Sequence, residues 1–176
     1  AGYDRARAAG DGDEAARWAF WAAFNSMLRG QMAHAGGWLG RATDALDGDR
    51  DCPARGYLLL PRALGALDAG DPAAARELAV AAGGIAAKCG DEDLAALATL
   101  GEGQALLAAG EIASGLRRLD DVMLSVTAGT VGPIVTGVVY CAVVVACVEL
   151  IDVARAREWT AALDALCRGQ PDLVPY

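Results

Sequence analysis

A small residue recurs along this chain at a nearly constant interval of 40, 40 and then 41 residues. The recurring positions are Ala35, Ala75, Gly115 and Ala156. Five residues before the first three positions stand Gly30, Gly70 and Gly110. Each occurrence predicts the end of one helix, a tight turn and the start of the next. A period in this range indicates stacked helical hairpins, and such arrays usually serve as binding surfaces.

Start and stop signals predict eight helices in this pattern. We expect helices from Asp11 or Asp13 to Arg29, Gln31 to Leu46, Pro53 to Ala69, Asp71 to Cys89, Asp91 to Ala109, Gly110 to Thr127, Pro133 to Leu150 and Asp152 to Arg168. Residues 47–51 are expected to form a loop, and Pro61 is expected to kink its helix.

The chain is therefore predicted to be a single all-α domain, a right-handed α–α superhelix of about four antiparallel hairpins. The expected repeats cover residues 13–50, 51–90, 91–130 and 131–170. Residues 1–9 fit the same register as the end of a helix from a preceding repeat. We accordingly expect this sequence to be a fragment of a larger protein.

The spacing within each second helix explains why the small positions matter. They lie one helical turn beyond the turn between helices, where a small side chain lets the paired helix approach closely. Four and seven residues further on, the same helix face carries Leu39 with Ala42, Ala79 with Ala82, Leu119 with Val122 and Thr160 with Leu163. This arrangement resembles the tetratricopeptide repeat, although the period is longer than the 34 residues of that family. Ile151 stands where the fourth turn glycine is expected.

Composition excludes several functions for this segment. The 176 residues carry a net charge of −8, and only Arg117 and Arg118 are adjacent basic residues, which argues against direct contact with nucleic acid phosphates. Lys88 is the only lysine, and alanine and glycine are abundant, as in proteins from GC-rich organisms such as actinobacteria. Residues 131–148 carry no charge and are long enough to suggest a membrane span. However, Gly132 and Pro133 begin the stretch, Glu149 follows it directly and no basic residues flank it. A buried helix is therefore favoured over a membrane span.

The five cysteines do not form a Cys-x-x-Cys motif. We interpret them as reduced, buried residues of a cytoplasmic protein. They are Cys52, Cys89, Cys141, Cys147 and Cys167.

Three phrases of the sequence resemble the helical-repeat region of large bacterial LuxR-family transcriptional regulators. They are ARWAFWAAFNSMLRGQMAHAGGWLGRA, RGYLLLPRAL and REWTAALDALCRGQPDLVPY. In such regulators a nucleotide-binding domain often precedes this region and a helix-turn-helix domain follows it. Neither a phosphate-binding loop nor a basic recognition helix occurs here. The resemblance implies a sensing or scaffolding role, with DNA contacted only through a separate domain.

No residue set predicts catalysis, a cofactor or a metal site. His34 is the only histidine and is expected to be structural. Asp91, Glu92 and Asp93 are interpreted as helix-capping residues, and the pair Asp120 and Asp121 as a solvated face. An enzyme fragment stays as an alternative, and its candidate polar residues are His34, Glu102, Gln104 and Tyr140.

The candidate binding surface is a concave groove lined by the first helix of each hairpin. Mapping by register places Arg17, Phe20, Trp21, Phe24, Tyr57, Leu60, Leu64, Leu97, Gln104, Val138, Cys141 and Val145 there. This apolar groove would suit an amphipathic protein segment or a small apolar effector. The alternatives are that these side chains only pack against neighbouring helices, or that the segment is a scaffold that self-associates through its ends.

Overall fold

The computed structural model describes residues 2–46 and 52–169, and within these ranges the chain is helical and contains no strand. This confirms the all-α prediction. The helices are α1 (Gly2–Ala8), α2 (Gly12–Leu28), α3 (Met32–Ala45), α4 (Pro53–Asp68), α5 (Pro72–Cys89), α6 (Glu92–Ala108), α7 (Ile112–Thr127), α8 (Pro133–Glu149) and α9 (Val153–Gly169). The loop expected at 47–51 lies outside the described residues.

Acidic side chains cap several helix starts, as the sequence predicts. Asp11, Asp71 and Asp91 each accept a hydrogen bond from the backbone N–H three residues later, at 2.9, 3.0 and 2.9 Å. Asp11 is thus the cap of α2, and the alternative, Asp13, lies inside the helix. The helix continues through Pro61, and the expected kink there stays a prediction.

The turns between helices share one backbone conformation. Gly30, Gly70 and Gly110 have φ of 71°, 76° and 82°, in the left-handed region that glycine adopts without steric cost. Ile151 has φ of 58° and is the one described non-glycine residue with positive φ. The fourth turn therefore keeps the geometry of the others although its glycine is missing.

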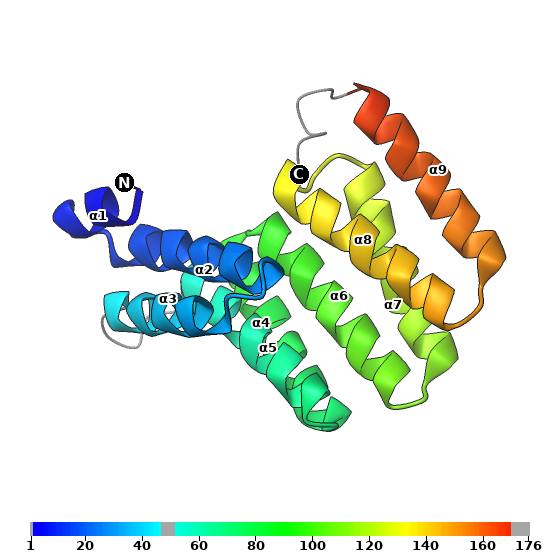
Figure 1. The fold of residues 1–176 in the computed structure, drawn as a ribbon, viewed down its shortest axis with the longest axis horizontal. Coiled ribbons are helices and arrows are strands. Elements are labelled where there is room, and N and C mark those ends of the chain that lie inside the picture. Colours follow the sequence, from blue (N-terminus) through cyan, green and yellow to red (C-terminus); the bar gives the residue numbers. More distant parts are fainter. Residues whose placement is uncertain (1, 47–51, 170–176) are drawn as a thin grey trace.

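Neighbouring helices pack as antiparallel pairs, namely α2 with α3, α4 with α5, α6 with α7 and α8 with α9. The first helices of successive pairs also contact one another, α2 with α4, α4 with α6 and α6 with α8, and α5 packs along α6. Figure 1 shows α1 to α3 at one end of the molecule and α8 and α9 at the other. Contacts are therefore made mostly between neighbours along the chain.

Two apolar clusters form the core. The larger includes Tyr57, Leu94, Leu119 and Val139, all without measurable exposure, and runs from α2 to α9. The smaller consists of alanines of α1 to α4, and Tyr3 and Trp38 pack against them. The rings of Tyr3 and Trp38 meet edge to face, with their centroids 5.6 Å apart. Alanine there allows the backbones of these helices to lie close together.

The recurring small positions lie where the paired helices cross. Ala35, Ala75 and Gly115 are buried, whereas Ala156 is half-buried. A Cβ atom on Gly115 would lie 2.6 Å from Leu107 Cδ2 and 3.0 Å from the backbone oxygen of Gly103. At this crossing of α6 and α7, only glycine fits without displacement of a neighbour.

Hydrogen bonds join the N-terminal ends of the first helices in succession. Asp13 Oδ1 accepts from the Ala54 N–H at 3.1 Å, and Asp93 Oδ1 accepts from the Gly132 N–H at 2.7 Å. Between these two links, the Tyr57 hydroxyl donates to Asp91 at 3.1 Å. Burial, and then the charge of Asp91, raise the pKa of Tyr57 well above its ordinary value, so the hydroxyl remains a donor. The line α2, α4, α6 and α8 is thereby fixed at one end.

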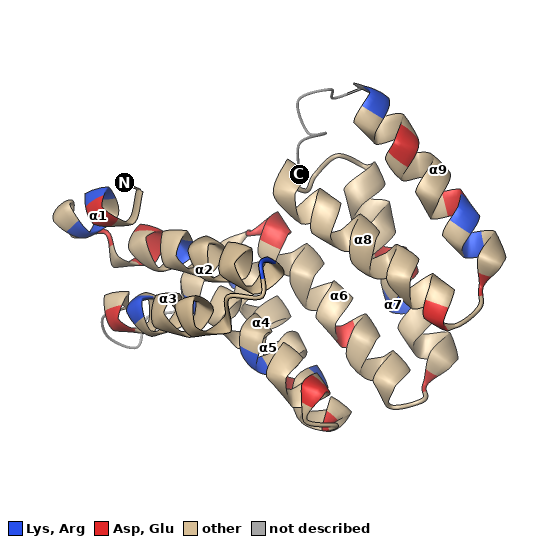
Figure 2. Ribbon diagram, in the orientation of Figure 1, with Lys and Arg blue, Asp and Glu red and all other residues tan. Residues whose placement is uncertain are grey.

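Helix α8 carries no charged residue before Glu149, its last residue, and is buried along one face only. Val135, Val139 and Val143 are buried, whereas Val145 and Val148 are 54% and 63% exposed, so the helix that was expected to be buried packs one face against the core and leaves the other open. Figure 2 shows that the middle of α8 carries no charge. Among the described residues, no helix is long and apolar enough to cross a membrane.

Candidate functional site

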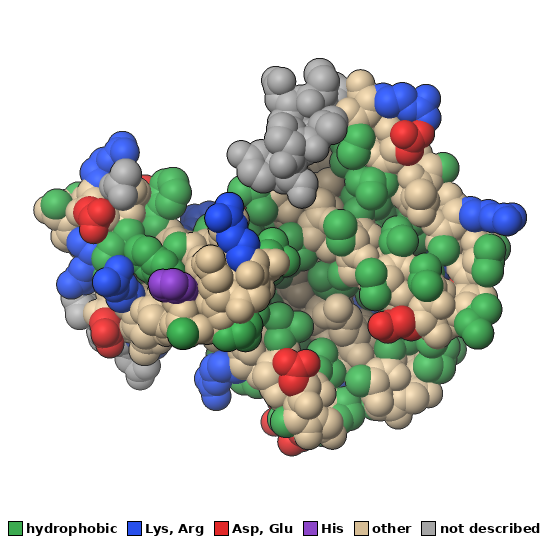
Figure 3. All heavy atoms as spheres, viewed as in Figure 1, with side chains coloured by type: hydrophobic (Ala, Val, Ile, Leu, Met, Phe, Trp, Pro, Cys, Tyr) green, Lys and Arg blue, Asp and Glu red, His purple; other side chains and the backbone are tan. Residues whose placement is uncertain are grey.

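A cavity of about 140 Å³ lies on the inner side of the first helices. Its walls come from α2, α4, α6 and α8, with Leu39 of α3 at one edge. Figure 3 shows the surface hollowed between the α2–α3 end and the α6–α8 end, with hydrophobic side chains around the hollow. The cavity is therefore assembled from residues of all four helical pairs.

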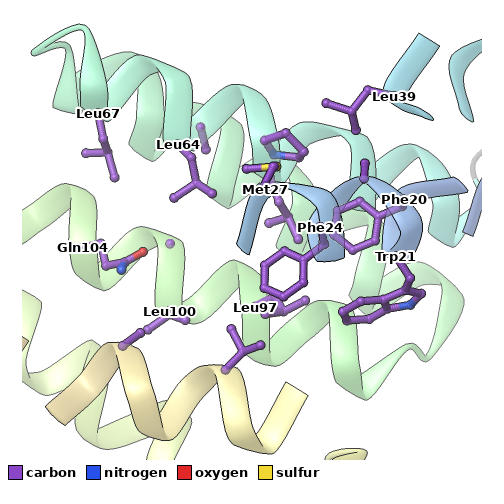
Figure 4. Close-up of a pocket in the computed structure, with 17 residues that line it drawn as sticks. Phe20, Trp21, Phe24, Met27, Leu39, Leu64, Leu67, Leu97, Leu100 and Gln104 are labelled. Atoms are coloured by element: carbon purple, nitrogen blue, oxygen red, sulfur yellow. The ribbon is translucent and has the colours of Figure 1, made fainter. Parts of the chain in front are cut away.

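Aromatic side chains of α2 form one wall, as Figure 4 shows. Trp21 packs edge to face on Phe24, with ring centroids 5.8 Å apart, and Phe20 lies 5.1 Å from Trp21. Beneath them the Tyr57 ring contacts Phe20 at 5.0 Å. Such ring pairs contribute about 0.5–1.5 kcal/mol each beyond the area that they bury, so they stabilise this wall.

The opposite walls are aliphatic. They are made by Leu60, Leu64 and Leu67 of α4 and by Leu97 and Leu100 of α6, with Val138 and Ala142 of α8. The lining contains no charged side chain. Burial of a charged ligand group here would lack a compensating partner, which is costly in an apolar environment.

Gln104 carries the one side-chain amide of the lining, and the indole N–H of Trp21 is the other side-chain group there that can form a hydrogen bond. Gln104 projects from α6 into the space between α4 and α6 (Figure 4). In the part of the chain that the structure describes, its amide makes no hydrogen bond. The amide can therefore both donate to and accept from a bound molecule.

Eight of the twelve predicted groove residues line this cavity. They are Phe20, Trp21, Phe24, Leu60, Leu64, Leu97, Gln104 and Val138. The structure does not bring the other four to it. Tyr57 is fully buried under the aromatic wall, and Arg17 stacks on its ring at 5.7 Å, near Asp91 and Asp93. Cys141 and Val145 lie on the exposed face of α8.

Sequence reasoning missed other lining residues. They are Ala23, Met27, Leu39, Pro61, Ala63, Leu67, Leu100, Gly101 and Ala142. Met27, Leu67 and Leu100 lie seven residues after Phe20, three after Leu64 and three after Leu97, so helical spacing from the predicted residues could have found them. Leu39 gave no such signal, because it belongs to a second helix.

The candidate polar residues of an enzyme do not converge. Gln104 lines the cavity, whereas the buried Glu102 of the same helix is paired with Arg118 of α7 at 2.8 Å and Arg76 of α5 at 3.5 Å. Tyr140 is buried, and burial raises its pKa. His34 is exposed on α3. Glu102 thus joins three helices and does not face a common site with the other three.

The acidic pair of α7 is not a simple solvated face. Asp120 accepts two hydrogen bonds from Arg155 of α9, at 3.1 and 2.8 Å, while Asp121 contacts Arg118. These bonds, and those to Asp152, raise the pKa of Arg155. The backbone N–H and the guanidinium of Arg155 in turn lower the pKa of Asp152, the residue before α9. Asp120 therefore fastens α9 to α7.

Cysteine burial differs from the expectation. Cys147 is buried, which raises its pKa, but Cys89 and Cys141 are exposed and the other two cysteines are partly buried. All five thiols are free. Within the described ranges 2–46 and 52–169, no group of three or more His, Cys, Asp or Glu residues could hold a metal ion.

Comparison of the chain with protein-family models, with curated proteins and with solved structures found no match.

Proposed function

We propose that this chain is a non-enzymatic ligand-sensing domain, built as a right-handed superhelix of about four tetratricopeptide-like hairpins. The observation that carries the proposal is the apolar cavity, which takes its walls from the first helices of four successive pairs. Since repeats contact mainly their neighbours, a molecule held between them can change the angles at which they stack.

The size of the cavity favours a small effector over a protein segment. A helix is about 10–12 Å across, so it would not enter a cavity of about 140 Å³, and a peptide could insert only one side chain. An engineered apolar cavity of about 150 Å³ binds benzene. The proposed effector is therefore compact and mostly apolar.

The particular protein that we propose is a LuxR-family transcriptional regulator, of which this chain is the helical-repeat region. Support comes from the sequence phrases described above and from the net charge of −8, which suits a segment that leaves DNA contact to another domain. In this proposal the domain is cytoplasmic and contacts neither membrane nor DNA. Effector binding alters the curvature of the superhelix, or its self-association, and so acts on the distant domains.

The proposal is tested by ligand titration with two blocking variants and a matched control. Ala142→Phe places a ring in the cavity, Leu64→Trp narrows its rim, and Val145→Phe adds the same ring as the first variant on the exposed face of α8. We expect apolar small molecules to raise the melting temperature and change the radius of gyration of the wild type and the Val145→Phe variant only. Unchanged values across a broad effector panel would refute a sensing function.

A second candidate function is a self-associating scaffold. It is favoured by an open groove of about 640 Å³ at the α8–α9 end, where Val148, Ile151 and Val153 are exposed. Light scattering over a range of protein concentrations tests it. A mass that rises with concentration and does not respond to effectors would favour the scaffold.

A further inference from the structure

The volume and the lining of the cavity restrict the size, the charge and the number of polar groups of a ligand. We propose that the ligand is an uncharged aromatic or branched aliphatic molecule about the size of a substituted benzene, with one hydroxyl or carbonyl group that hydrogen-bonds the Gln104 amide. This inference rests on the proposed sensing function and specifies its ligand class.

The volume of the cavity sets the size of the part of the ligand that it holds. At about 140 Å³ it is close to the engineered cavity of about 150 Å³ that holds benzene, and well below the roughly 300–1,000 Å³ of drug-sized sites. The wall of Phe20, Trp21 and Phe24 offers ring edges and faces that suit an aromatic or branched aliphatic group. A long chain or a sugar would not fit wholly inside this space.

The lining sets the charge. Seventeen residues surround the cavity and none of them is ionisable at neutral pH. Glu102, which lies two residues before Gln104 on α6, is paired with Arg76 and Arg118 on the other side of that helix. A carboxylate or ammonium group in the cavity would therefore lose its hydration without gaining an ion pair.

Gln104 sets the number of polar groups. It is the one side chain of the lining that carries a hydrogen-bonding amide, and that amide has no partner among the described residues. A ligand with one polar group can satisfy it, whereas the only other hydrogen-bonding side chain of the lining is Trp21, whose indole N–H can donate but cannot accept. The polar end of the ligand would lie at the α4–α6 side and the apolar end against the aromatic wall (Figure 4).

Four probes that differ in one group separate these requirements: toluene, benzyl alcohol, benzylammonium and benzoate. Binding is measured by the change in Trp fluorescence and by the ligand-induced shift in melting temperature, for the wild type and the Gln104→Leu, Ala142→Phe and Val145→Phe variants. We expect benzyl alcohol to bind about threefold to tenfold more tightly than toluene, and the charged probes not to bind detectably.

The variants distinguish the inference from the function on which it depends. In Gln104→Leu, toluene should bind as well as in the wild type, while benzyl alcohol should lose its advantage. If Ala142→Phe abolishes toluene binding, the cavity is a binding site. If, in addition, a charged probe binds the wild type at least as tightly as toluene, or benzyl alcohol binds no more tightly than toluene, the proposed ligand class is wrong although the sensing site remains. If no probe binds the wild type, the ligand class is wrong. The proposed function then fails as well if the broader effector panel also gives no response.

Discussion

Replacement of Ile151 by glycine is expected to stabilise the protein, although it removes a large apolar side chain. In the turn from α8 to α9, the Ile151 N–H donates to the Val148 oxygen at 3.0 Å and the Asp152 N–H donates to the Cys147 oxygen at 2.8 Å. The turn at Gly110 makes the same two bonds, both at 2.9 Å. Ile151 thus adopts a glycine backbone conformation with a β-branched side chain.

The magnitude follows from three contributions. The left-handed conformation costs a non-glycine residue about 1–2 kcal/mol, and relief of this strain favours the variant. Glycine makes the unfolded chain more flexible, which costs about 0.5–1 kcal/mol. The Ile151 side chain is 82% exposed, so its removal uncovers little apolar area. The sum is a stabilisation of about 1 kcal/mol, or about 2–4 °C in melting temperature for a chain of this length.

Urea denaturation and calorimetry of the I151G variant measure this effect, and two controls test its cause. V148G introduces glycine at an exposed position in the last turn of α8 and should destabilise by about 0.5 kcal/mol, the difference in helix propensity between valine and glycine. G110A places a side chain in the equivalent turn, where a Cβ would meet no atom within 4 Å, so it should destabilise through backbone strain alone. A lower stability of I151G than of the wild type would refute the argument from backbone conformation.

Three further changes test the packing and the electrostatics. G115A should lower the free energy of unfolding by about 1–2 kcal/mol, because its Cβ meets Leu107. G84A, where a Cβ meets nothing within 4 Å, should raise it by about 0.5–1 kcal/mol. Urea denaturation compares the two variants, and equal effects would contradict the close helix crossing at Gly115. R118L should lower the free energy of unfolding by about 2 kcal/mol, because the buried Glu102 carboxylate then loses its closer arginine. E102L should lower it by less, because the arginines that it leaves unpaired can still reach water. The reverse order in urea denaturation would contradict this explanation. The pKa of Asp152 is lowered in the folded state, so its contribution to stability is complete above the unfolded value of about 4 and is lost as the pH falls through the folded value. The difference in melting temperature between the wild type and D152A should therefore narrow from pH 7 to pH 2, and a constant difference would show that the charge of Asp152 does not matter.

The helices and turns were predictable because local signals mark them. Asp11, Asp71 and Asp91 precede helices as caps, and the glycines at 30, 70 and 110 adopt the turn conformation that their spacing predicts. These features depend on a few neighbouring residues. Sequence reasoning about them needs no knowledge of tertiary packing.

The orientation of α8 could not be predicted in the same way. Between Ile134 and Val148 this helix has no charged residue to mark its solvent-facing side, so register alone assigned Cys141 and Val145 to the groove. The structure turns Val138 and Ala142 toward the cavity. Tyr57 was misplaced for a related reason, since its aromatic ring suited a groove as well as a core.

The hydrogen bonds that join the first helices alternate along the chain, and this alternation defines a larger building block. Asp13 and Asp93, 80 residues apart, each accept from the start of the following first helix, where proline is the first helical residue at Pro53 and Pro133. If one 40-residue hairpin were added or removed, two neighbouring first helices would both begin with an aspartate acceptor, or both begin with proline. The hydrogen bond between them would then be lost. In protein engineering terms, the unit that can be duplicated or excised without breaking these links is a pair of hairpins.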